Sequence, residues 1–240
     1  MSQPTLSGAE RMARAAGPMR VPRRTAALAV FLLAALLPLN AQSLESVLSR
    51  SRYSPEVRGE VGRLFQEAGQ RGIPVEMLLP RLEEGIAKKV PAARLLAVLE
   101  REQELLLQAR SLLSGLDGGE KLVRDRASWA RAANLLAAGY AGDEVAELAR
   151  ASLNRTEDFR PAASLYVSLR GWGLLAGPAL ELVRGLLASP ISGERFPGIM
   201  ELFIEGRRLR LQPETLIQRL LEQLPQARTI EELRRMCLQP

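Results

Sequence analysis

Apolar residues recur along this chain at spacings of three and four positions, between short stretches that carry Gly and Pro. The pattern is clearest in "ARLLAVLEREQELLLQARSLL" at 93–113 and in "PETLIQRLLEQL" at 213–224. Such spacing places the apolar side chains on one face of an α-helix. No run of alternating apolar and polar residues bounded by hairpin turns occurs. The sequence therefore predicts an all-α fold.

The turns between the expected helices also recur. An apolar residue, often followed closely by Pro, marks a turn about every 17 residues, which is the length of one short helix and its connection. Two such steps form an antiparallel helical hairpin of about 35 residues. The pattern predicts an irregular, α-solenoid-like stack of hairpins, and a compact helical bundle that reuses one turn type is the alternative. The marking residues are Ile73, Val90, Tyr140, Phe159, Leu174, Phe196, Leu211 and Ile230.

Several helix starts can be placed from local chemistry. Pro is favoured in the first turn of a helix, so Pro55 after Ser54 and Pro213 after Gln212 indicate helix N-termini. Thr229 with Glu at 232 has the spacing of a capping box.

The clearest break between helices is the glycine-containing stretch "SGLDGGEKL" at 114–122. It predicts an N-terminal helical part at 42–114 and a C-terminal helical part at 122–240. The second part belongs either to the same domain or to a second helical subdomain.

The first 41 residues have the features of an export signal. Arg20, Arg23 and Arg24 form a positive region, Ala26–Leu37 is continuously apolar, and Ala41 offers a small residue for cleavage. The interpretation predicts that 1–41 is removed and that the protein is periplasmic or secreted. An uncleaved anchor in the inner membrane is the alternative, although the apolar run is shorter than the roughly 20 residues of a spanning helix.

The start of translation is left open among Met1, Met12 and Met19. It changes only the length of the positive region that precedes the apolar run.

The net charge of +6 is concentrated in this N-terminal region. Residues 1–41 contain five Arg and one Glu, which leaves 28 basic and 26 acidic residues in the remainder. The mature chain is therefore nearly neutral, and nucleic acid is not an expected partner.

Two distant segments resemble each other. "EEGIAKKVPAARLL" at 83–96 aligns with "IEGRRLRLQPETLI" at 204–217, with a Glu-Gly pair in each. We expect Gly85 and Gly206 to allow close approach of another helix. Glu84 is expected to form a surface ion pair with Lys88, and Glu205 with Arg208. The Glu-Gly pair is thus interpreted as architecture.

The first of these segments also carries the pattern Glu84-Gly85, two residues, Lys88, one residue, then Val90-Pro91. This EGxAKxVP-like segment resembles one found in uncharacterised exported all-helical proteins of bacteria. The resemblance implies a helical, exported protein, and it implies no activity.

The residue inventory restricts the chemistry. The chain contains no His and a single Cys, Cys237, so Ser-His-Asp and Cys-His nucleophiles, His-containing zinc sites and thiolate clusters are excluded. We predict no catalytic, cofactor or metal-binding residues. Cys237 cannot form an internal disulfide, and it is expected to be a half-exposed tail thiol or an interchain link.

Four residues are candidates for partner binding. Arg207, Arg208 and Arg210 lie near an expected helix C-terminus, where they would be solvated or would contact an acidic partner or lipid phosphate. Trp172 lies between two glycines and would either pack between hairpins, which we favour, or anchor a partner.

Taken with the export signal, these features predict a non-catalytic binding or scaffolding protein of the bacterial cell envelope. Its partner would be a protein or peptide, and its oligomeric state is not indicated. The alternatives are a membrane-apposed envelope factor held by an uncleaved anchor, with weak contact to the membrane surface, and a carboxylate-dependent cell-wall hydrolase.

Overall fold

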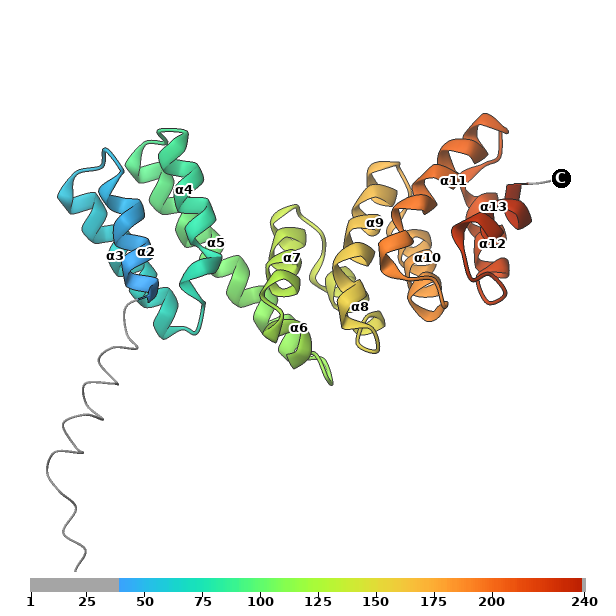
Figure 1. Ribbon diagram of the computed structural model, residues 1–240, viewed down its shortest axis with the longest axis horizontal. Coiled ribbons are helices and arrows are strands. Elements are labelled where there is room, and N and C mark those ends of the chain that lie inside the picture. Colours follow the sequence, from blue (N-terminus) through green and yellow to red (C-terminus); the bar gives the residue numbers. More distant parts are fainter. Residues whose placement is uncertain (1–38, 239–240) are drawn as a thin grey trace, which may run out of the picture. The chain divides into compact units, whose positions relative to one another are not determined.

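The computed structural model describes residues 39–238, which are α-helical and contain no β-strand (Figure 1). The all-α prediction is therefore confirmed. The chain divides into two compact units, Met1–Ser51 and Arg52–Pro240. The described part of the first unit forms helix α2 (Leu39–Ser49).

The second unit contains eleven further α-helices and three short 3-10 helices, η1 to η3, within its described residues. In chain order they are α3 (Pro55–Gln70), η1 (Val75–Met77), α4 (Leu79–Ala87), α5 (Ala92–Ser114), α6 (Glu120–Arg124), α7 (Arg126–Ala137), α8 (Gly142–Ala151), η2 (Thr156–Asp158), α9 (Phe159–Gly171), α10 (Ala176–Ala188), η3 (Gly193–Arg195), α11 (Pro197–Arg208), α12 (Pro213–Gln223) and α13 (Ile230–Leu238).

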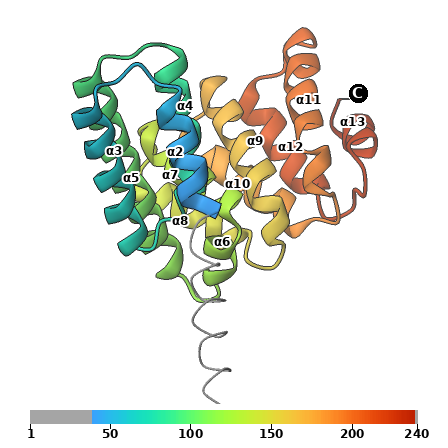
Figure 2. The ribbon, with the colours of Figure 1, turned by 60° about the vertical axis from the view of Figure 1, so that its left-hand side comes forward.

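Helices of the second unit pack mainly on helices that lie near them in the chain. Helix α7 packs on α5, α9 on α7, and α11 on α9, while α8, α10 and α12 form a second succession of contacts. Figures 1 and 2 both show α9, α10, α11 and α12 side by side. Helix α13 closes this end of the unit against α11 and α12.

The core between these helices is built mainly from Leu and Ala. Two of its aromatic side chains, Trp129 and Tyr166, form hydrogen bonds. Trp129 is buried and donates a hydrogen bond from Nε1 to the carbonyl oxygen of Leu106 at 2.7 Å. Tyr166 is fully buried, and burial raises the pKa of its hydroxyl to about 12.

Five of the eight predicted turn positions share one backbone geometry. In each, the N–H of the marking residue donates to the carbonyl oxygen five positions earlier, and the residue just before it has a positive φ. This is the Schellman arrangement, which satisfies carbonyls at a helix C-terminus. The bonds join Ile73 to Ala68, Val90 to Gly85, Tyr140 to Leu135, Leu174 to Leu169 and Leu211 to Gly206, at 2.9 to 3.2 Å.

The other three positions are of a different kind. Phe159 begins α9, Phe196 caps α11, and Ile230 begins α13. All three are buried, so they fix where a helix enters the core rather than how the preceding helix ends. The single turn type expected from the sequence is thus two types that alternate from Tyr140 onward.

The predicted helix starts are observed. Ser54 caps α3 by accepting a hydrogen bond from the N–H of Val57, and Pro213 occupies the first turn of α12. Thr229 accepts from the N–H of Glu232, and the Glu232 carboxylate accepts from the N–H of Arg228 at 2.7 Å. The reciprocal bond of this capping box therefore reaches one residue further back than expected.

The glycine-containing break at 114–122 separates α5, which ends at Ser114, from α6, which begins at Glu120. Helices α6 and α7 both pack directly on α5. The division into parts at 42–114 and 122–240 stays a prediction.

The apolar run of the expected export signal lies in residues 1–38, outside the described residues. Its expected cleavage point after Ala41 falls within α2. None of the helices at 39–238 has both the length and the apolar character needed to span a membrane.

Cys237 is not half-exposed, as the sequence suggested, but fully buried in α13. Its thiol lies on the same face as Leu233 and Ile230, which are also buried. Burial raises the pKa of the thiol to about 11.

Candidate binding site at the ends of α9 and α11

The two Glu-Gly turns are built in the same way. Gly85 near the end of α4 faces Leu95 of α5, and a Cβ at this position would clash with Leu95 Cδ1. Gly206 in α11 faces Leu216 of α12, where a Cβ would lie 2.9 Å from Leu216 Cδ2. Both glycines are buried, so the expected close approach of a second helix is confirmed at both positions.

The acidic residues of the two turns have different partners. Glu84 pairs with Lys88 at 2.6 Å and with Arg81 at 2.8 Å, and the hydrogen bond from Lys88 is the main cause of its lowered pKa. The expected pairing of Glu205 with Arg208 is wrong. Glu205 Oε2 instead lies 3.2 Å from Nε of Arg234 in α13, as a charge contact without aligned hydrogen-bond geometry.

Glu205 is therefore not paired with the cations of the second turn. Arg234 also pairs with Glu201 at 3.0 Å, so α13 engages two acidic residues on α11. Within the described residues, neither Arg207, Arg208 nor Arg210 forms an ion pair. All three are exposed and lie at the C-terminal end of α11.

Trp172 brings an aromatic face to these cations. It caps the C-terminus of α9, is half-buried, and lies under the guanidinium of Arg207 at 5.9 Å from the ring centroid. The two residues come from helices that pack side by side, α9 and α11. Trp172 therefore lies where α9 and α11 meet and keeps part of its aromatic surface accessible.

A pocket of about 390 Å³ opens at this point. Its floor is apolar, with Phe203 and Leu216 almost completely buried. Trp172, Arg207 and Arg210 line it together with Leu211, Gln212 and Pro213 at the start of α12. The structure thus brings together three of the four residues singled out from the sequence, and Arg208 lies outside the pocket lining.

Sequence reasoning missed the floor of the pocket. Phe203 and Leu216 carry only the ordinary signal of a helix face that points into the core. The correspondence of Leu216 with Leu95 in the two matching segments could have indicated that it packs at the turn.

The backbone of Arg210 is in the left-handed region, with φ of 62°. The corresponding residue is glycine in three other Schellman turns, Gly72, Gly139 and Gly173, where positive φ carries no side-chain penalty. Arg210 therefore holds its side chain at the pocket at the cost of local backbone strain.

Two large apolar side chains that lie close in sequence to lining residues of the pocket face solvent. Leu175, three residues after Trp172, is 76% exposed, and Leu209, between Arg208 and Arg210, is 55% exposed. They are the most exposed large apolar residues in the described part of the chain. Exposed apolar groups that gather beside a pocket are typical of contact surfaces.

The first Glu-Gly turn forms a smaller counterpart of the pocket, of about 300 Å³. Arg81, Lys88 and Arg94 line it, but so does Glu84, which pairs with two of these three cations. The counterpart has the same architecture, but two of its three cations are paired with a carboxylate that also lines the pocket.

At a third turn, the corresponding arginine is also paired with a carboxylate. Arg170 occupies in α9 the position that Arg207 occupies in α11, four residues before the marking residue of the turn. It lies over the ring of Tyr140 at 5.8 Å, pairs with Glu144 at 3.0 Å, and donates to the hydroxyl of Tyr166 at 2.9 Å. Only the turn after α11 keeps an arginine stacked on an aromatic ring without a carboxylate, among these three.

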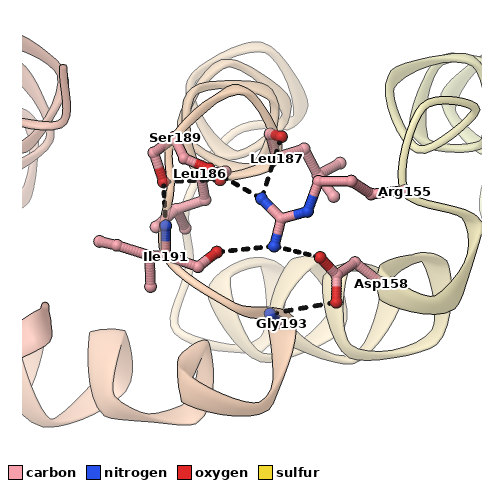
Figure 3. Close-up of polar contacts among 7 residues, drawn as sticks. All are labelled: Arg155, Asp158, Leu186, Leu187, Ser189, Ile191 and Gly193. Atoms are coloured by element: carbon pink, nitrogen blue, oxygen red, sulfur yellow. Dashed lines mark hydrogen bonds and ion pairs between the residues drawn. The ribbon is translucent and has the colours of Figure 1, made fainter. Parts of the chain in front are cut away.

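The most connected polar cluster of the second unit lies elsewhere and is structural. Arg155 pairs with Asp158 and donates to three carbonyls, those of Leu187 (3.3 Å), Ser189 (2.7 Å) and Ile191 (2.8 Å), as Figure 3 shows. Asp158 also accepts from the N–H of Gly193 at 3.1 Å. These bonds join the loop after α8 to the end of α10 and the loop that follows it.

The chemical capacity of the Trp172 pocket follows from its lining. Two guanidinium groups supply donors for an anion, and the half-buried Trp172, Leu211 and Pro213 supply contact area for a carbon skeleton. The lining contains no carboxylate, hydroxyl or thiol that could act as base or nucleophile. In residues 39–238 no cluster of His, Cys, Asp and Glu has metal-site geometry.

No family model, curated protein or solved structure matches this chain. The function is therefore inferred from the geometry of the pocket and its turns.

Proposed function

We propose that this chain is a non-catalytic binding or scaffolding protein of the bacterial cell envelope. Stacked helical hairpins present the ends of α9 and α11 to a protein or peptide partner. Its proposed location is the periplasm or outside the cell, as expected from the export signal at 1–41. The observation that carries the proposal is the pocket at Trp172, in which Arg207 and Arg210 have no acidic partner among the described residues.

Electrostatics support this assignment. Arginines at a helix C-terminus are favourable for the helix dipole, but that interaction is worth less than about 1 kcal/mol at an exposed position. It does not require that two of them converge on a concave surface with an aromatic wall. Arg and Trp are the residues that most often supply binding energy at protein interfaces, which favours a partner that covers this pocket.

The exposed side chains of Leu175 and Leu209, which we call the apolar rim, favour a second candidate, a membrane-apposed factor. Leu175 and Leu209 could enter a lipid surface while Arg208 contacts phosphate groups. The pocket argues for the protein or peptide partner, since a flat lipid surface would use the rim and leave the pocket unfilled.

Affinity capture from envelope extract tests the proposal. The full chain and two variants, Arg207→Gln/Arg210→Gln and Arg208→Gln, would serve as bait, and circular dichroism melts would show that each is folded. The same partner should be retained by the parent and by Arg208→Gln and lost from the double variant. Equal retention by all three, or enrichment of anionic lipid in place of protein, would reject the proposal.

A further inference from the structure

The pocket at Trp172 combines two cations with an apolar floor, and this combination restricts the chemistry of its ligand. We propose that it binds a carboxylate that is attached next to an apolar side chain, as found at the free C-terminus of a peptide. This inference rests on the proposed function and specifies the partner's binding group. Arg207 and Arg210 would hold the carboxylate, and the adjacent side chain would lie between Trp172 and Phe203.

The charged residues that line the pocket indicate that its ligand is an anion. The lining carries Arg207 and Arg210 and no acidic residue, whereas the matching pocket at the first Glu-Gly turn contains Glu84 among its cations. The acidic residue of the second turn, Glu205, contacts Arg234 instead and does not line the pocket. A planar guanidinium matches the two oxygens of a carboxylate, so two of them can fix its orientation.

The apolar residues of the lining indicate that the anion is attached to an apolar group. Phe203 and Leu216 close the bottom of the pocket but are only 2% and 1% exposed, so the half-buried Trp172, Leu211 and Pro213 supply the apolar surface that a ligand would contact. A volume of about 390 Å³ is near the lower limit of small-ligand pockets, which suits one apolar side chain and its terminal carboxylate.

Arg210 adds a third observation. Its left-handed backbone would be relaxed by glycine, the residue at this position in three of the other turns, and glycine would remove one of the two cations. Lys89 has the same left-handed backbone at the first Glu-Gly turn but does not line the pocket there, so the placement of Arg210 in the lining distinguishes the second turn.

Direct titration of peptides tests the inference. Fluorescein-labelled hexapeptides that end in Ala, Val, Leu or Phe would be titrated with the full chain as free acids and as C-terminal amides. A third series, amidated, would carry an internal Asp followed by the same apolar residues. Anisotropy would be measured at low salt and at physiological salt, since charge pairing weakens with ionic strength.

At least one free-acid peptide should bind, and its amide should bind at least about tenfold more weakly, because one charged group is lost. Arg207→Gln and Arg210→Gln should each weaken the free acid by a similar factor. Arg208→Gln, with the same change in net charge outside the pocket lining, should leave it within about twofold. Trp172→Ala should weaken the free acid and the amide alike, because it removes apolar contact.

Three results would overturn the inference: equal binding of acids and amides, equal loss in Arg207→Gln and Arg208→Gln, or no binding of any free acid. Preference for the internal Asp series would assign the carboxylate to an acidic side chain and reject the C-terminal form. Binding of anionic vesicles that all three arginine variants weaken equally would assign the surface to lipid. If the peptides fail while envelope capture still depends on Arg207 and Arg210, the proposed function stands without this ligand.

Discussion

Replacing Gly85 with Ala should not give the gain in stability that Ala, the better helix former, gives at an open helix position. The matched control is Gly62→Ala, within α3, where nothing lies within 4 Å of the position of a new Cβ. At Gly85 the new methyl group would clash with Cδ1 of Leu95, which is itself 1% exposed. The pair of variants separates helix propensity from close packing.

The magnitudes follow from these two environments. Replacing an interior helix glycine with Ala gains up to about 1 kcal/mol of helix propensity, so Gly62→Ala should be more stable than the parent by about this amount. Overpacking of a core typically costs about 1–3 kcal/mol, so Gly85→Ala should be neutral to about 2 kcal/mol less stable. The two variants should therefore differ by about 1–3 kcal/mol in the free energy of unfolding.

Urea denaturation followed by circular dichroism measures this difference, with the slope of the transition as a check on two-state behaviour. Leu95→Ala would remove the clashing group, and the cost of Gly85→Ala should disappear in that background. If Gly85→Ala is as stable as Gly62→Ala, the close approach at the Glu-Gly turn is absent and the shared architecture of the two turns is refuted.

Three further predictions concern residues outside this contact. Lys89→Gly should raise the free energy of unfolding by about 0.5–1 kcal/mol in urea melts, because its φ of 53° suits glycine; an unchanged midpoint would contradict the strain. Arg155→Met should lower the free energy of unfolding by about 2–4 kcal/mol, because Asp158 would remain buried without its cation. In an Asp158→Asn background this decrease in stability should be much smaller. The pKa of Cys237 is raised by burial from 9.0 to about 11, so its protonated thiol stabilises the fold fully below pH 9 and loses this contribution as the pH rises. The stability difference between the parent and Cys237→Ala should accordingly shrink by about 1 kcal/mol between pH 8 and pH 10, and a constant difference would place the thiol in solvent.

The sequence predicted the helical fold and most turn positions because these depend on short-range rules. Pro55 and Pro213 mark helix starts through the lost N–H and fixed φ of proline, which act within one turn of helix. Gly85 and Gly206 could be assigned to close packing because each interrupts an apolar helix face with a missing side chain, which leaves room for a second helix.

Pairings between helices could not be predicted in the same way. Glu205 has an arginine three residues later, and local spacing favoured that pair, but Arg234 from α13 reaches it instead. Arg155 and Asp158 have the spacing of an ordinary surface pair, yet the loop after α10 packs against them and its carbonyl oxygens accept hydrogen bonds from Arg155. In both cases the deciding partner lies about 30 residues away, where sequence spacing carries no information.

The candidate site was found from the sequence only in part. Trp172 and the arginines were noticed for their residue types, while the fact that Trp172 meets Arg207 depends on how α9 packs on α11. The unneutralised charge of the pocket depends in turn on α13. The sequence therefore identified these residues, but it could not predict that they lie together in one pocket.

Photo-cross-linking in intact cells tests the central claim most directly. A photoreactive amino acid at Leu209, beside the pocket, would be compared with one at Val98, which lines the matching pocket at the first turn, where Glu84 pairs with two of the three cations. A discrete protein adduct should form from Leu209, should disappear in the Arg207→Gln/Arg210→Gln background, and should be absent from Val98. Adducts of equal yield from both positions, or an adduct from Leu209 that survives loss of the two arginines, would contradict partner binding at the Trp172 pocket.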